Sequence, residues 1–320
     1  MCLRGFSLPI ADEPRTYKTG PRYPSAMKAE IYLWGDPMDL RSLIDTLPWE
    51  WPKNAGKLFL ETLVDKQANE SDRLIAAELA GDLTVMNDEL AEVLLAIVGS
   101  GDEPEELRRK AAISLGPVLE QGYTELVEDD EFDDPGGVPI SFDTFRNIQD
   151  SLRQLYLDES NPKELRRRIL EAAVRAPQDW QTDPIRAAYS SGDKEWMRTA
   201  VFAMGRVRGF DNQILEALES SDPAIHCEAV NAAGVWELDA AWPHVVALVE
   251  DPSTPKDLLL AAIEAVGYIR PHEAGEILAD LADSRDGEIS EAATEAIAMA
   301  QAMSGGGDDK EIEDEGEWIN

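Results

Sequence analysis

The chain has 320 residues, 43% of them apolar, and a formal net charge of −35 from 64 acidic and 29 basic residues. Proteins that bind nucleic acid or anionic membranes rely on Lys and Arg, so this balance argues against both kinds of partner. No run of about 18 apolar residues suggests a membrane span, and we recognise no signal segment. The two cysteines, Cys2 and Cys227, are too few and too far apart in sequence for a disulfide framework or a metal site. We therefore expect a cytoplasmic protein.

The N-terminal part divides at Met27. Residues 1–26 contain four prolines and no helical period, so they are either a disordered arm or a mis-assigned start, with translation beginning at Met27. Residues 27–53 hold Trp34, Trp49 and Trp51. We predict that they cap the repeats that follow, because the first repeat of a stack must cover its apolar face. An aromatic docking site formed by the three tryptophans is the alternative.

Residues 54–303 contain a repeated pattern of two helices joined by a short turn. The second helix of each repeat ends near Gly81, Gly116, Val174, Gly205, Gly234, Gly267 and Ala298. Five residues before these end points stand Ala76, Ala111, Ile169, Ala200, Ala229, Ala262 and Ala293. A small or apolar residue that recurs at one position indicates helix packing, and repeats of about 20 to 50 residues are typical of solenoids. The sequence thus predicts an all-α fold, a right-handed α-solenoid of helix pairs.

Two acidic segments interrupt or follow this array. Gly122 to Pro139 combines acidic residues with glycine and proline, which predicts an exposed loop inserted between repeats. Residues 304–320 contain three consecutive glycines followed by an acidic run, which predicts a disordered tail.

The repeats resemble HEAT repeats of the short bacterial kind, which also occur in phycobilisome lyase-like proteins. The resemblance is strongest at Leu107 to Gly116, Leu165 to Ala173 and Asp222 to Gly234. The arginine of the family pattern matches Arg73, Arg108 and Arg166, and later repeats lack it. The resemblance implies helix pairs, with the family's Asp–Arg ladder between neighbouring repeats in the first half of the array. It implies no single function, because such folds host scaffolds, adaptors, transport receptors and some enzymes.

Catalytic and metal-binding signatures are weak. His226 and Cys227 are adjacent, and adjacent residues on a helix point about 100° apart. HEAT-repeat di-iron hydroxylases need several His-Glu pairs, whereas this chain has one, His272-Glu273. The motifs of serine hydrolases, phosphate-binding loops and zinc proteases are missing from the sequence. We therefore predict no catalytic residue, no metal site and no cofactor.

A stripe of residues on the second helices gives the strongest indication of binding. Positions seven before, three before and one after each end point share a helix face. Its arginines are Arg109, Arg167, Arg175, Arg198 and Arg206. The predicted binding residues are Arg109, Arg167, Arg198, Phe202, Arg206, Glu264 and Tyr268. Pairing within a helix, as between Arg167 and Glu171, is the simpler alternative.

Three functions follow as hypotheses. The main one is a noncatalytic scaffold or adaptor that binds a protein or peptide along this stripe, on the concave face of the solenoid. In this hypothesis the acidic loop, or the tail from Asp308, lies transiently over the stripe and competes with the partner. The second is an enzyme or accessory that handles a prosthetic group, as bilin lyases do. The third is an acidic mimic of nucleic acid that sequesters a basic protein.

Overall fold

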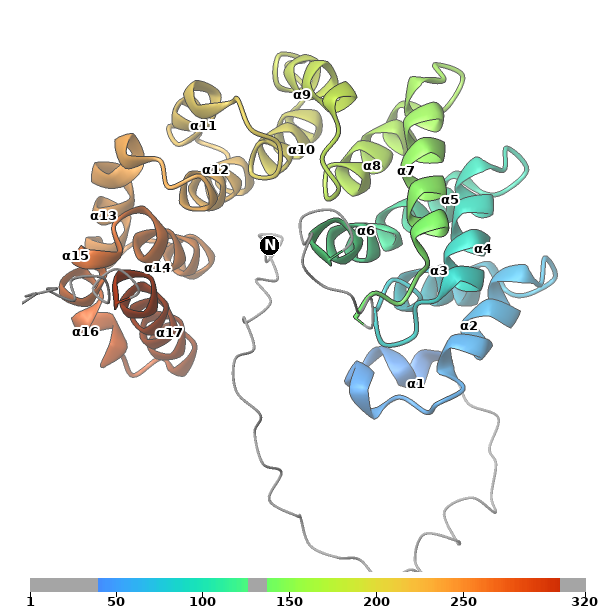
Figure 1. The fold of residues 1–320 in the computed structure, drawn as a ribbon, viewed down its shortest axis with the longest axis horizontal. Coiled ribbons are helices and arrows are strands. Elements are labelled where there is room, and N and C mark those ends of the chain that lie inside the picture. Colours follow the sequence, from blue (N-terminus) through green and yellow to red (C-terminus); the bar gives the residue numbers. More distant parts are fainter. Residues whose placement is uncertain (1–39, 126–136, 306–320) are drawn as a thin grey trace, which may run out of the picture. The chain divides into compact units, whose positions relative to one another are not determined.

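The computed structural model describes residues 40–125 and 137–305 (Figure 1). All regular structure in these two ranges is helical, which confirms the predicted all-α solenoid. The helices fall into two compact units that meet in sequence between Ala172 and Ala173. Among the residues described, we find no helix with the length and apolar character that crossing a bilayer requires.

The N-terminal unit, residues 40–172, contains three helix pairs and three additional helical segments. The pairs are α2 (Ala55–Val64) with α3 (Glu70–Leu79), α4 (Asp88–Gly99) with α5 (Glu105–Ser114), and α7 (Phe142–Leu157) with α8 (Lys163–Ala173). The additional segments are α1 (Leu40–Ile44), the 3-10 turn η1 (Pro48–Glu50) and α6 (Gly116–Tyr123). Helix α3 packs on α5, and α2 packs on α4, so first and second helices form separate layers.

The C-terminal unit, residues 173–305, continues the same pattern. Its pairs are α9 (Thr182–Tyr189) with α10 (Lys194–Met204), α11 (Asp211–Ala217) with α12 (Pro223–Val235), and α13 (Trp242–Glu250) with α14 (Lys256–Ile269). The last second helix, α17 (Gly287–Gly305), follows α15 (Pro271–Ile277) and α16 (Ala279–Ala282). Two 3-10 turns, η3 (Asp179–Gln181) and η4 (Asp239–Ala241), precede α9 and α13. Helices α10, α12, α14 and α17 pack successively on one another within this unit (Figure 1).

Short polar side chains start many of these helices. A side-chain oxygen accepts a hydrogen bond from an amide of the first turn at Asn69, Asn87, Ser141, Asp193 and Asp222. Such caps satisfy amides that have no partner inside the helix. At α12, Asp222 caps the helix and Pro223 opens it, as the sequence predicts.

The recurring small residues lie where successive second helices meet. All seven residues found five positions before the repeat end points are fully buried. The glycines at the end points allow close approach: a Cβ on Gly81 would lie 3.0 Å from the Cα of Ser114, and one on Gly234 would lie 3.0 Å from the Cα of Ala265. Interiors pack densely, so neither site has room for an added carbon.

Arginines connect the repeats of the N-terminal unit. Arg73, Arg108 and Arg166 each donate to a backbone carbonyl oxygen at the end of the preceding first helix. The acceptors, each ten residues earlier, belong to Leu63, Val98 and Tyr156. Arg73 also forms a 2.6 Å ion pair with Glu103, and Arg108 donates to the Oδ1 atom of Asn161 at 2.7 Å. These three arginines are the ones that match the family pattern.

The segment between α5 and α7 differs from the predicted loop of Gly122 to Pro139. Gly122 belongs to helix α6 and is buried, because its missing side chain lets Phe145 of α7 pack against it. A Cβ there would lie 2.7 Å from the Cδ2 atom of Phe145. The glycine that we interpreted as a helix breaker thus serves a helix contact. Most of the predicted acidic loop, the N-terminal arm, residues 27–39 of the cap, and the tail beyond Gly305 lie outside the described residues.

Candidate functional site

The C-terminal unit holds a cluster of arginines around Phe202 on α10, which we name the α10 arginine cluster: Arg175, Arg198, Arg206 and Phe202. The guanidinium carbon of Arg206 lies 3.8 Å from the centroid of the Phe202 ring, and that of Arg175 lies 5.5 Å from it. Arg206 also donates to the carbonyl oxygen of Phe202 at 3.4 Å. Arg198 stands one helical turn before Phe202, on the same face of α10. Sequence analysis placed these residues on one stripe, and the structure places the guanidinium groups of Arg175 and Arg206 near the same aromatic ring.

Phe202 positions the arginines and is not itself an exposed anchor. Its side chain is only 3% exposed, whereas the three arginines are half-buried. A guanidinium group that stacks on an aromatic face loses much of its rotational freedom before any ligand arrives. The cluster therefore concentrates positive charge around one ring in a protein of net charge −35.

The other predicted stripe residues are placed differently. Arg109 pairs with Glu105 and Glu106 one turn earlier on α5. Arg167 is 5% exposed and lies 3.0 Å from Glu164 and 3.9 Å from Glu171, so its guanidinium group is used within α8. The simpler alternative of pairing within a helix holds for these two arginines. They belong to the N-terminal unit, whereas the α10 arginine cluster belongs to the C-terminal unit.

Glu264 and Tyr268 lie one turn apart on α14. Glu264 is exposed and Tyr268 is half-buried. Exposed acids also occupy the equivalent face of α17, at Glu291 and Glu295. Within the C-terminal unit, the stripe therefore changes from basic on α10 to acidic on α14 and α17.

The tryptophans near the N-terminal end have different environments. Trp34 lies outside the described residues. Trp49 is 73% exposed. Trp51 donates from its indole nitrogen to the carbonyl oxygens of Leu43 and Thr46, at 3.1 and 3.0 Å, and its ring meets Phe59 edge-on. These contacts favour a structural role for Trp51, which also lines an open cavity of about 560 Å³ beside Lys110.

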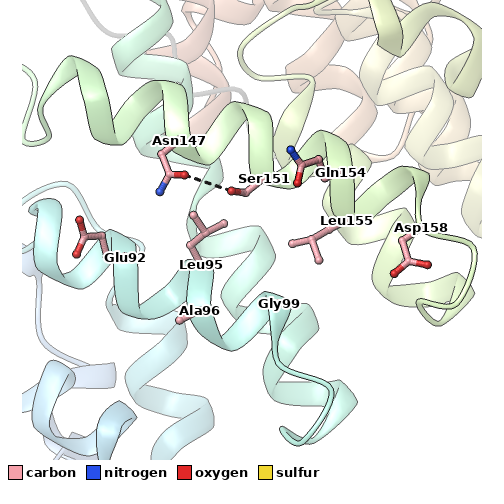
Figure 2. A pocket seen from close by; sticks show the side chains of 9 residues that line it. All are labelled: Glu92, Leu95, Ala96, Gly99, Asn147, Ser151, Gln154, Leu155 and Asp158. Atoms are coloured by element: carbon pink, nitrogen blue, oxygen red, sulfur yellow. Dashed lines mark hydrogen bonds between the residues drawn. The ribbon is translucent and has the colours of Figure 1, made fainter.

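A second open cavity, of about 520 Å³, lies between α4 and α7 in the N-terminal unit (Figure 2). None of the predicted site residues lines it. Ser151 lies 3.4 Å from the amide oxygen of Asn147, and an amide cannot take up the proton that a serine nucleophile must lose. Glu92 and Asp158 stand at opposite ends of the cavity (Figure 2). Hydrogen bonds from Ser160 lower the pKa of Asp158, which indicates a turn-forming carboxylate. The cavity thus lacks an evident acid–base pair.

Sequence analysis missed one contact between titratable groups. His226 of α12 and His244 of α13 face each other, with their Nε2 atoms 2.7 Å apart. Glu219 lies 3.6 Å from the Nδ1 atom of His244. Burial and the neighbouring His244 lower the pKa of His226. The two histidines are 18 residues apart and lie in the first turns of two successive helices, so no local motif signals the contact. In the part of the chain that the structure describes, no three His, Cys, Asp or Glu side chains gather as a metal site.

Comparison with known proteins gives a weak similarity of fold. No protein-family model matches the sequence, and no curated protein matches it. Among solved structures, the chain is similar to human deoxyhypusine hydroxylase, with 16% identity over 82% of this chain and 89% of that chain, and a TM-score of 0.36. Identity this low bears on the helical fold and says nothing of substrate or mechanism.

This comparison corrects the main functional hypothesis. We predicted a noncatalytic scaffold from the repeat fold, yet the similar structure is that of an enzyme, a hydroxylase. The step from a helical repeat array to a noncatalytic role was wrong, because such an array also serves enzymes. The coarser assignment, a helical repeat solenoid, stands.

Proposed function

We propose that the C-terminal unit binds a carboxylate-bearing prosthetic group at the α10 arginine cluster, and that the protein is an enzyme or enzyme accessory that handles this group. The observation that carries the proposal is the pair of guanidinium groups, from Arg175 and Arg206, that lie over the single ring of Phe202.

Guanidinium geometry favours carboxylate ligands. The planar group presents parallel N–H donors that match the two oxygens of a carboxylate, and such bidentate pairs are among the stronger hydrogen bonds in proteins. Two arginines fixed by one ring, with Arg198 one turn away, suit a ligand that carries more than one carboxylate. A second carboxylate binds at high effective concentration once the first is bound.

The charge pattern favours a compact ligand over an acidic chain. An extended acidic segment that ran along the second helices would meet exposed carboxylates at Glu264, Glu291 and Glu295. Charges farther apart than about 8 to 10 Å are largely screened at physiological ionic strength. A compact ligand at the α10 arginine cluster is therefore attracted by the local arginines and is affected less by the net charge of −35.

Biliverdin, a linear tetrapyrrole with two propionates, is a suitable probe, and its dimethyl ester is the matched ligand without carboxylates. We expect saturable binding of biliverdin, followed by absorbance or by tryptophan quenching, and much weaker binding of the ester. Arg198→Glu should weaken binding about tenfold or more, since a hydrogen bond to a charged group contributes about 1.5 to 3 kcal/mol.

Arg285→Glu is the control variant, because Arg285 is exposed in the same unit and its reversal changes the net charge equally. It should leave the affinity within about twofold, the scale expected for a distant screened charge. Equal loss in both variants, equal affinity for the diester, or no binding of biliverdin would each overturn the proposal.

A further inference from the structure

The contact between His226 and His244 involves two nitrogen atoms that each carry either a hydrogen or a lone pair. Their Nε2 atoms are 2.7 Å apart, and the ring planes are inclined at 65°. Two lone pairs that point at each other at this distance repel, and two N–H groups would clash. One positive centre between the nitrogens, either a proton held by one ring or a metal ion held by both, resolves the conflict.

Surrounding groups favour the form of histidine that binds metals. The exposed carboxylate of Glu219 lies 3.6 Å from the Nδ1 atom of His244, beyond hydrogen-bond distance, and its negative charge favours hydrogen on Nδ1, which leaves the lone pair on Nε2. A carboxylate that orients a histidine in this way is the usual arrangement behind a metal ligand.

The two rings are also held by the ends of rigid helices. His226 lies in the first turn of α12, where its backbone amide donates to the carbonyl of the capping Asp222 at 3.0 Å. His244 lies in the first turn of α13, which opens with Trp242 and Pro243. Both side chains are half-buried, so an ion can reach them while the backbone positions stay fixed.

We propose that His226 and His244 bind one divalent transition-metal ion through their Nε2 atoms, with Glu219 as the residue that positions His244. Imidazole nitrogens suit Zn²⁺, Cu²⁺ and Ni²⁺ rather than Mg²⁺ or Ca²⁺. Zinc–nitrogen bonds of about 2.0 to 2.1 Å in a tetrahedral site place two ligand nitrogens about 3.3 Å apart. The rings need to separate by about 0.6 Å, which small side-chain rotations supply. With two protein ligands, water occupies the remaining positions. This site is independent of the α10 arginine cluster.

The test is calorimetric titration of the full chain, without a histidine tag, with Zn²⁺ at pH 7.5. An excess of Mg²⁺ in the buffer occupies the many surface carboxylates, so that weak binding of any divalent ion does not contribute. We expect one zinc ion per chain. His226→Ala and His244→Ala should each abolish this site, and Glu219→Gln should weaken it about tenfold, the lower end of the effect of losing such a carboxylate.

His272→Ala is the matched control, since His272 is the third histidine of the sequence and is exposed on α15. It should bind Zn²⁺ like the wild type, and so should Arg198→Glu. Circular dichroism verifies folding of each variant, and His226→Gln replaces His226→Ala if the latter unfolds. Absence of a one-to-one site in the wild-type chain, or an equal loss in His272→Ala, overturns the proposal and leaves a shared proton as the explanation of the contact.

Discussion

Replacing Gly234 with alanine inserts a methyl group between helices α12 and α14. The new Cβ would lie 3.0 Å from the Cα and 3.1 Å from the Cβ of Ala265. Carbon atoms pack best at about 3.5 to 4.0 Å, so the helices would have to separate by about half an ångström or more. Overpacking of this kind costs about 1 to 3 kcal/mol. Since alanine is favoured over glycine inside a helix by about 1 kcal/mol, we expect a net destabilisation of about 1 kcal/mol.

Gly275→Ala supplies the control for helix propensity. Gly275 lies inside α15, and a Cβ there meets nothing within 4 Å. This variant should be up to about 1 kcal/mol more stable than the wild type. The two variants gain the same propensity term, so the difference between their unfolding free energies isolates the overpacking cost of about 1 to 3 kcal/mol. Urea unfolding followed by circular dichroism measures it, with the slope m unchanged if the unfolded surface is the same. Equal stabilisation by both substitutions would refute the close packing of α12 on α14.

Three further substitutions test the polar contacts. Glu103→Gln should cost about 3 to 5 kcal/mol in urea unfolding, because it leaves the charge of Arg73 buried without its partner, and a loss below about 1 kcal/mol would contradict the buried pair. The hydrogen bond from Arg73 lowers the pKa of Glu103 below 4.5. The ion pair therefore stabilises the folded protein above that pH, and this stabilisation is lost as the pH falls through the pKa of Glu103 in the folded state. Because the variant has no such carboxylate, it should lose less stability than the wild type on acidification below about pH 4.5. Lys256→Met removes exposed ion pairs with Asp286 and Glu288 and should lower the stability only slightly. That small difference should vanish in about 1 M salt, and its persistence would be inconsistent with exposed pairs. Asp222→Ala removes the cap of α12 and should cost about 1 kcal/mol, seen as a lower melting temperature, and an unchanged melting temperature would count against the cap.

The fold was predictable because each repeat carries its own signal. Positions that face a neighbouring helix recur at a fixed place before each end point, and Ala229 and its equivalents are fully buried. The arginines that match the family pattern, such as Arg73, make equivalent backbone contacts. Gly122 was misinterpreted because a glycine that breaks a helix and a glycine that admits a neighbouring ring look alike in sequence.

The candidate sites were predictable only in part. The helical period predicted Arg198, Phe202 and Arg206 on one face, and the structure places Arg206, just beyond the end of α10, over the ring of Phe202. The sequence did not reveal that Phe202 is covered by guanidinium groups, since burial depends on how α10 meets its neighbours. The contact of His226 with His244 depends on the spacing of two different repeats, and single-helix periodicity carries no information about it.

The glycine contact on α12 has a consequence for the motions of the C-terminal unit. Lysines at the start of α10 and α14 reach the capping aspartates of α12 and α17, through Lys194 with Asp222 and Lys256 with Asp286. Such long side chains can follow small rearrangements, and a Cβ on Gly205, between α10 and α12, would meet Ala232 at a looser 3.4 Å. Between α12 and α14 the backbones touch at Gly234, where a gap of even half an ångström would forfeit much of the dispersion energy. Helices α14 and α17 also meet closely, since a Cβ on Gly267 would lie 3.2 Å from the carbonyl oxygen of Ala296. Bending of this unit should therefore concentrate at the seam between α10 and α12, while α12, α13 and α14 move as one rigid block that keeps the spacing of His226 and His244 constant.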